Sequence, residues 1–70
     1  MMPLAIANVG ESKMIRKVSG APEVRKHLED LGFVVGGDVT IISHLGGNLI
    51  VNVKQSRIAI SSEMASRIMI

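Results

Sequence analysis

The sequence predicts a mainly β fold: a small barrel of five to six short antiparallel strands with one α-helix and a short C-terminal helical turn. Apolar and polar residues alternate through most of the segment from Val39 to Ile60, and this period of two is typical of strands with one buried face. Only the segment from Val24 to Leu31 has the spacing of an amphipathic helix. One helix cannot cover so many strands, and a closed or nearly closed barrel exposes fewer sheet edges than an open sheet.

The N-terminal part of the chain contains two apolar segments separated by turn residues. Leu4 to Ala7 is expected to form a short edge strand or an ordered arm. Lys13 to Val18 is predicted to be the first long strand. Ile15 and Val18 lie three positions apart, so both can face the core only if this strand contains a bulge.

The helix prediction depends on its two ends and its apolar stripe. Pro22 suits the first helical turn, where a backbone N–H is not needed. Val24, Leu28 and Leu31 follow at helical spacing and form one stripe. Gly32 occupies the position of a left-handed cap, so the helix is expected to end there.

An antiparallel meander of three strands is predicted next, at Asp38 to His44, Leu49 to Val53 and Ile58 to Ile60. The turns between these strands are Gly46-Gly47-Asn48 and Lys54-Gln55-Ser56. A glycine pair favours a tight hairpin because glycine reaches positive φ angles at little cost.

The C-terminal residues predict a helical turn followed by one more strand. Ser61 or Ser62 is expected to cap a turn over Glu63 to Ser66, and Ile68 and Ile70 alternate as the final strand. Together these elements favour an SH3-like barrel, with an OB-like barrel as the alternative.

Composition limits the domain count and the cellular setting. The chain has 70 residues and is expected to be a single domain over residues 1–70. Its apolar content of 47% excludes a disordered protein, and the absence of cysteine excludes a disulfide scaffold and thiolate metal sites. The sequence has neither a signal peptide nor an apolar run of about 20 residues, so a cytoplasmic location is expected.

The motifs of common catalytic sites are missing. Ser61-Ser62 has no base or orienting acid nearby in the sequence, which favours helix capping over nucleophilic catalysis. The glycines from Gly32 to Gly37 follow a helix and precede a strand, the reverse of a phosphate-binding loop. No catalytic residue and no cofactor are therefore expected, and a binding module remains, with loops and unburied apolar side chains as its contact surfaces.

Nucleic-acid binding is one alternative function. The net charge is only +2, and the chain has no Trp or Tyr on which bases could stack, so nucleic acid is not expected as a partner. If the barrel does bind nucleic acid, the cations that would serve are Arg16, Lys17, Arg25 and Lys26.

Direct metal sensing is a second alternative. It would use His27, His44 and the methionines, but no ligand cluster with metal-binding spacing is present, and no metal residue is assigned. The five methionines are better explained as packing residues in a core with a single aromatic side chain.

A family resemblance extends over nearly the whole chain. Leu28 to Gly36, which reads LEDLGFVVG, resembles the Leu-x-x-(Leu/Met)-Gly-(Phe/Leu)-x-Pro-Gly signature of FeoA-type proteins, although Val35 replaces the proline. Val9-Gly10-Glu11 resembles an early turn of the family. The segments that resemble its closing pattern are Arg57 to Ile60, Glu63 to Ala65 and Ile68 to Ile70.

The resemblance implies an SH3-like barrel that acts by protein contact in bacterial ferrous-iron uptake. The implied partner is the cytoplasmic side of FeoB, a large membrane GTPase that transports ferrous iron. The same domain type occurs at the C-terminus of metal-dependent repressors, which is the alternative within this resemblance.

We predict that the partner contacts the corner after the helix, at Leu31, Phe33 and Val34. Phe33 has a competing interpretation as a core residue, because a lone aromatic in so small a domain is usually buried. A homo-oligomer is a further expected interaction, since self-association covers the exposed edges of small barrels.

Overall fold

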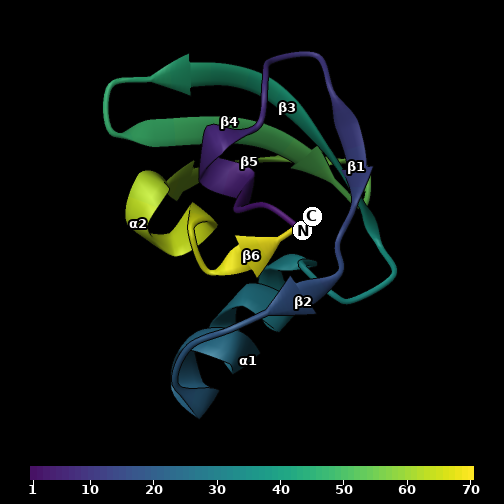
Figure 1. Cartoon of the computed structure of the whole chain (residues 1–70), viewed down its shortest axis with the longest axis vertical. Helices are drawn as coiled ribbons and strands as arrows, with labels where there is room; N and C mark the ends of the chain where they lie inside the picture. The colour runs from purple at the N-terminus through teal and green to yellow at the C-terminus, as the bar shows by residue number, and fades with distance from the viewer.

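A computed structural model describes all residues from 1 to 70, and Figure 1 shows its arrangement. In chain order the elements are η1 (Leu4–Ile6), β1 (Ser12–Met14), β2 (Lys17–Val18), α1 (Pro22–Leu31), β3 (Asp38–Leu45), β4 (Asn48–Val53), β5 (Ser56–Ser61), α2 (Ser62–Ala65) and β6 (Ile68–Met69). The strands form a four-stranded antiparallel sheet in the order β1-β3-β4-β5 and a separate two-stranded sheet of β2 and β6. The mainly β prediction is confirmed, but the two sheets do not join into one closed ring.

The predicted meander is present as β3, β4 and β5. Gly46-Gly47 connects β3 to β4, and a register shift between Ile41 and Ser43 marks a bulge in β3. The turn between β4 and β5 consists of Lys54 and Gln55, whose φ angles are 50° and 64°. Two positive φ angles in a two-residue loop are the geometry of a type I′ hairpin turn.

The predicted strand from Lys13 to Val18 is two strands that belong to different sheets. The amide of Ile15 donates to the carbonyl of Gly37 at 2.8 Å, while the next amide, that of Arg16, donates to Met69 at 2.8 Å. The chain therefore leaves the large sheet and joins the small one between these two residues. This change of sheet, rather than a bulge within one strand, accommodates the fully buried Ile15 and the half-buried Val18.

The apolar segment at the N-terminus is a 3₁₀ helix, η1, so of the two expected forms the edge strand is wrong and the ordered arm fits the structure. Its backbone bonds are local, from Ile6 to Pro3 at 3.2 Å and from Ala7 to Leu4 at 3.1 Å. The segment packs on α2 and β6 with Leu4 fully buried, and only Pro3, just before it, forms a single bridge to β6, at Met69. A turn of helix satisfies its backbone groups without any strand partner.

The helix prediction is confirmed at both ends. Helix α1 begins at Pro22 and ends before Gly32, which has a φ of 111° and is its left-handed cap. Leu28 is fully buried, and its stripe neighbours Val24 and Leu31 are half-buried against the core. In Figure 1, α1 lies at one end of the long axis of the molecule, next to β2.

The C-terminal elements also match the prediction. The hydroxyl of Ser61 accepts a hydrogen bond from the amide of Met64 at 3.2 Å and so caps α2. Ala65 of this turn and Ile68 of β6 are fully buried. No helix of the structure combines the length and the apolar character needed to span a membrane.

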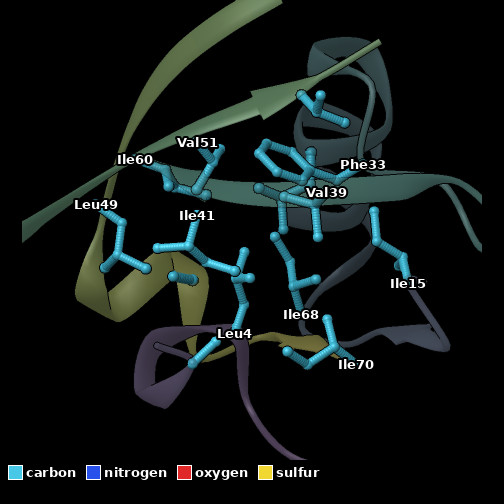
Figure 2. Packing of buried hydrophobic residues seen from close by; sticks show 14 residues of the cluster. Leu4, Ile15, Phe33, Val39, Ile41, Leu49, Val51, Ile60, Ile68 and Ile70 are labelled. Carbon is cyan, nitrogen blue, oxygen red and sulfur yellow. The ribbon is translucent and has the colours of Figure 1, made fainter. Parts of the chain in front are cut away.

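One hydrophobic cluster of 14 residues fills the space between the two sheets, α1, α2 and η1. Figure 2 shows labelled side chains from η1 and from strands of both sheets converging on one space, and nearly all of them are aliphatic. Phe33 is the only aromatic member. No polar or charged residue is buried with the cluster.

Candidate partner-binding surface

The corner after α1, residues 31–37, is held by backbone hydrogen bonds. The amide of Gly32 donates to Glu29 and Leu28, and the amide of Phe33 donates to the same Leu28 carbonyl at 2.9 Å. A tight turn follows, in which the amide of Gly37 donates to the carbonyl of Val34 at 3.0 Å. These bonds fix the direction in which each side chain of the corner points.

The structure separates the three residues predicted to contact a partner. Phe33 is fully buried, and its ring points into the cluster (Figure 2), which confirms the competing interpretation as a core residue. Leu31 and Val34 are half-buried and keep some accessible surface. Direct partner contact at the corner stays a prediction, and in this structure only Leu31 and Val34 of the three residues offer accessible surface for it.

The apolar residue that the corner exposes most is one that the sequence prediction did not select. Val35 is 67% exposed. Val35 stands where the signature of FeoA-type proteins has proline, a residue type that is mostly exposed in proteins. This replacement of proline was the one feature of the sequence that could have predicted an exposed apolar side chain here.

The four cations considered for nucleic-acid binding are all exposed but lie on different elements. Arg16 and Lys17 are at and after the break between β1 and β2, whereas Arg25 and Lys26 are on α1. Lys26 pairs with Asp30 of the same helix at 3.9 Å. Helix α1 also carries two exposed glutamates, so it presents both signs of charge rather than a basic face.

The two histidines considered for metal sensing are far apart. His27 is exposed on α1, whereas His44 lies near the tip of the β3–β4 hairpin, toward the other end of the molecule (Figure 1). His44 Nε2 is 3.1 Å from the carbonyl oxygen of Ala7. No group of three or more His, Cys, Asp or Glu side chains is placed to hold a metal ion.

A hollow of ≈ 440 Å³ lies where the two ends of the chain meet the end of β1. The ends are joined by the amide of Met2, which donates to Ile70 at 3.0 Å, and by the reciprocal bond at 2.8 Å. The sequence did not predict this hollow, because its lining comes from three separate stretches; the concentration of methionine near the N-terminus was the only hint. The lining residues are Met1, Met2, Lys13, Met14, Arg16 and Ile70.

The interpretation of the methionines as packing residues therefore holds for some of them and not for others. Met2 and Met64 pack against the core, as expected of gap-filling residues. Met1 and Met14 are instead 78% and 46% exposed at the hollow. Exposed methionines are common on binding surfaces because their flexible thioether side chains adapt to different partners.

Comparisons with known proteins agree with this architecture. A family model described as the FeoA domain matches residues 2–70. The protein named Fe(2+) transport protein A in Methanocaldococcus jannaschii is 31% identical over 70 residues, which are 100% of this chain and 85% of that protein.

Solved structures share the fold. The crystal structure of an iron uptake regulatory protein, FeoA, has a TM-score of 0.90 at 25% identity and covers 97% of this chain and 90% of its own. The zinc-complexed FeoA of Stenotrophomonas maltophilia, described as an SH3 domain protein, has a TM-score of 0.80 at 25% identity over 99% and 88% of the two chains. The SH3-like prediction is thereby confirmed.

A manganese-dependent transcriptional repressor also has this fold, with a TM-score of 0.85 over 94% of this chain, but it is only 14% identical and 38% covered. That likeness concerns the fold alone. The match of the FeoA family model to residues 2–70, together with the full-length relative, assigns the family. The chain belongs to the FeoA family.

Proposed function

We propose that this chain is a cytoplasmic, non-catalytic accessory protein of ferrous-iron uptake that binds the cytoplasmic side of the membrane GTPase FeoB and modulates it. The observation that carries the proposal is the FeoA family match over residues 2–70. The relative that aligns with the whole chain bears the name of a ferrous-iron transport protein, which supports the same process.

The polar side chains support a role in binding rather than catalysis. The hydroxyls of Ser19 and Ser66 donate to backbone carbonyls, at 3.0 Å and 2.6 Å, and that of Ser61 caps α2. His44 contacts a backbone carbonyl and has no serine or carboxylate partner. A nucleophile needs a hydrogen-bonded base, and these groups are engaged in holding the fold instead.

Exposed aliphatic side chains provide the contact surface that such a role requires. Five apolar residues in different parts of the chain are more than half exposed, and a patch of such side chains is typical of an interaction site. They are Ile6, Val9, Val35 and Leu45, in addition to Met1.

The test is a calorimetric titration of the purified chain with the cytoplasmic GTPase domain of FeoB from the same genome, with an unrelated GTPase domain as control. Saturable binding to the first domain alone is expected. In parallel, anaerobic uptake of radioactive ferrous iron is measured in cells that lack the gene, and uptake should change and be restored by the intact gene. Absence of binding together with unchanged uptake contradicts the proposal.

A further inference from the structure

Strand β1 leaves one of its backbone edges free. It is the outermost strand of the large sheet, and β3 is its only neighbour. On either side of β1, the carbonyl of Glu11 accepts a hydrogen bond from the amide of Ile41 in β3, and Ile15 is hydrogen-bonded to Gly36 and Gly37, just before β3. Bonded pairs alternate along an antiparallel ladder, so Lys13 is the bonded residue between them. The N–H and C=O groups of Ser12 and Met14 therefore point away from β3 and have no partner.

The hollow lined by the methionines lies along this free edge. Lys13 is paired with Val39, a core residue, so its side chain lies on the inner side of the sheet. Met14 is paired with the exposed Asp38, so its side chain lies on the outer side. Both residues line the same hollow, which therefore lies at the edge and adjoins the unpaired backbone of Met14.

The charges around the hollow favour an acidic occupant. Two cations line it: Arg16 is exposed and has no carboxylate within ion-pair distance, and Lys13 has only a 3.6 Å contact with Glu11. A second copy of the chain fits this edge poorly. Two-fold antiparallel pairing of β1 about its central residue would place two Lys13 side chains opposite each other, and like charges in that position repel.

We propose that the β1 edge and the adjoining hollow bind an extended segment of a partner protein that combines apolar and acidic residues. The segment adds a strand to the large sheet through main-chain hydrogen bonds with Ser12 and Met14. One apolar side chain enters the hollow among the methionines, and a neighbouring carboxylate pairs with Lys13 or Arg16. This inference rests on the proposed function only for the identity of the partner as FeoB.

The first test uses a fluorescein-labelled peptide of alternating valine and glutamate, followed by anisotropy and by amide shifts in NMR spectra of the labelled protein. Saturable binding with the largest shifts at Ser12 and Met14 is expected. A valine–lysine peptide serves as the charge control and should bind at least about tenfold more weakly. The same valine–glutamate peptide with N-methylated amides keeps the side chains but lacks main-chain donors, and it should also lose about tenfold. Equal binding of all three peptides, or shifts elsewhere, overturns the proposal.

The second test changes the protein. In Met14→Pro the free N–H is removed without loss of a bond to β3, and binding of the valine–glutamate peptide should fall about tenfold. The matched control is Ala59→Pro on β5, the opposite edge of the sheet. The amide of Ser62 donates to the carbonyl of Gly47, which identifies one hydrogen-bonded pair between β5 and β4. Bonded pairs alternate with non-bonded pairs along the ladder, so the N–H of Ala59 points away from β4. This control should bind like the wild type, and circular dichroism establishes that both variants are folded.

A charge reversal gives a measurement that does not depend on the proline variant. The double variant Lys13→Glu with Arg16→Glu should reverse the preference, so that the valine–lysine peptide binds more tightly than the valine–glutamate peptide. An unchanged preference contradicts the proposed occupant.

A final titration separates this inference from the proposed function. If the FeoB domain binds wild type and Met14→Pro equally well, the function holds and the β1 surface is wrong. If the peptide binds at the β1 edge and the FeoB domain does not bind, the surface holds and the proposed partner is wrong.

Discussion

Ile15 and Gly37 are joined across the molecule, with the amide of Ile15 donating to the carbonyl of Gly37 at 2.8 Å. The carbonyl of Ile15 in turn accepts a bond from the amide of Gly36, also at 2.8 Å. The point where the chain changes sheets is thus tied to the turn after α1, and the buried side chain of Ile15 anchors both. These bonds hold the corner in place. Its buried residue, Phe33, is therefore expected to affect stability, and its exposed residue, Val35, is expected to affect binding.

Gly32→Ala is expected to destabilise the fold by about 1–2 kcal/mol, because a side chain at a φ of 111° is strained. The new Cβ would lie 3.4 Å from Lys54 Cδ, an ordinary contact, so the cost comes from the backbone and not from a clash. Urea unfolding followed by circular dichroism measures the change.

Gly47→Ala is the matched control for this substitution. Gly47 is outside the left-handed region and has no atom within 4 Å of a built Cβ. Its effect should stay within about 0.5 kcal/mol, as for most surface substitutions. Equal losses for the two variants would show that the cap geometry is not the cause.

Gln55→Gly is expected to stabilise the protein by about 0.5–1 kcal/mol. Gln55 has a φ of 64° in the β4–β5 turn, and glycine relieves that strain at a smaller cost in chain entropy. Gln55→Ala keeps the Cβ atom and should give no gain. The urea midpoints of the two variants distinguish them, and a gain from alanine equal to that from glycine would contradict the explanation.

The parts of the fold that sequence predicted well are those specified by local patterns. Helix α1 has its own proline, apolar stripe and glycine cap, and the meander has alternation and two turn signals. Leu4–Ile6 has no periodicity to decide its conformation, and packing on α2 and β6 selects a 3₁₀ turn. The division of Lys13 to Val18 depends on the position of Met69, which no local pattern encodes.

The candidate site was less predictable because it too depends on contacts between residues that are distant in the sequence. Whether Phe33 faces the core or the solvent depends on how the corner turns, and the corner buries it while exposing Val35. The hollow beside β1 is assembled from residues such as Met2, Met14 and Ile70, which only the folded chain brings together. A single sequence carries no signal for such long-range contacts unless the residue types are themselves unusual.

Ser61→Ala is expected to lower stability by about 1 kcal/mol, because it removes the hydroxyl that accepts the Met64 amide proton at the start of α2. For a domain of this size the thermal midpoint should fall by roughly 4–8 °C. Ser62→Ala, one residue later and exposed, makes no such bond and should leave the midpoint within about 2 °C. A similar fall for both variants would argue against the assigned cap.

Phe33→Leu and Val35→Ser should affect stability and binding in opposite ways. Phe33 is fully buried, so its truncation creates a cavity and should cost at least about 1 kcal/mol. Val35 is 67% exposed, so its replacement should change stability by less than about 0.5 kcal/mol. If the partner contacts the corner, Val35→Ser weakens binding of the FeoB domain, whereas folded Phe33→Leu binds like the wild type.

Calorimetry of both variants with that domain, below their unfolding temperatures, makes the comparison. The reverse outcome, with binding lost in folded Phe33→Leu and kept in Val35→Ser, would mean that the ring acts at the interface despite its burial, which requires the corner to open when the partner binds. Unchanged binding in both variants would move the contact away from the corner. The free edge of β1 would then be the surface to test, because Met14 and Lys13 lie on it, outside residues 31–37.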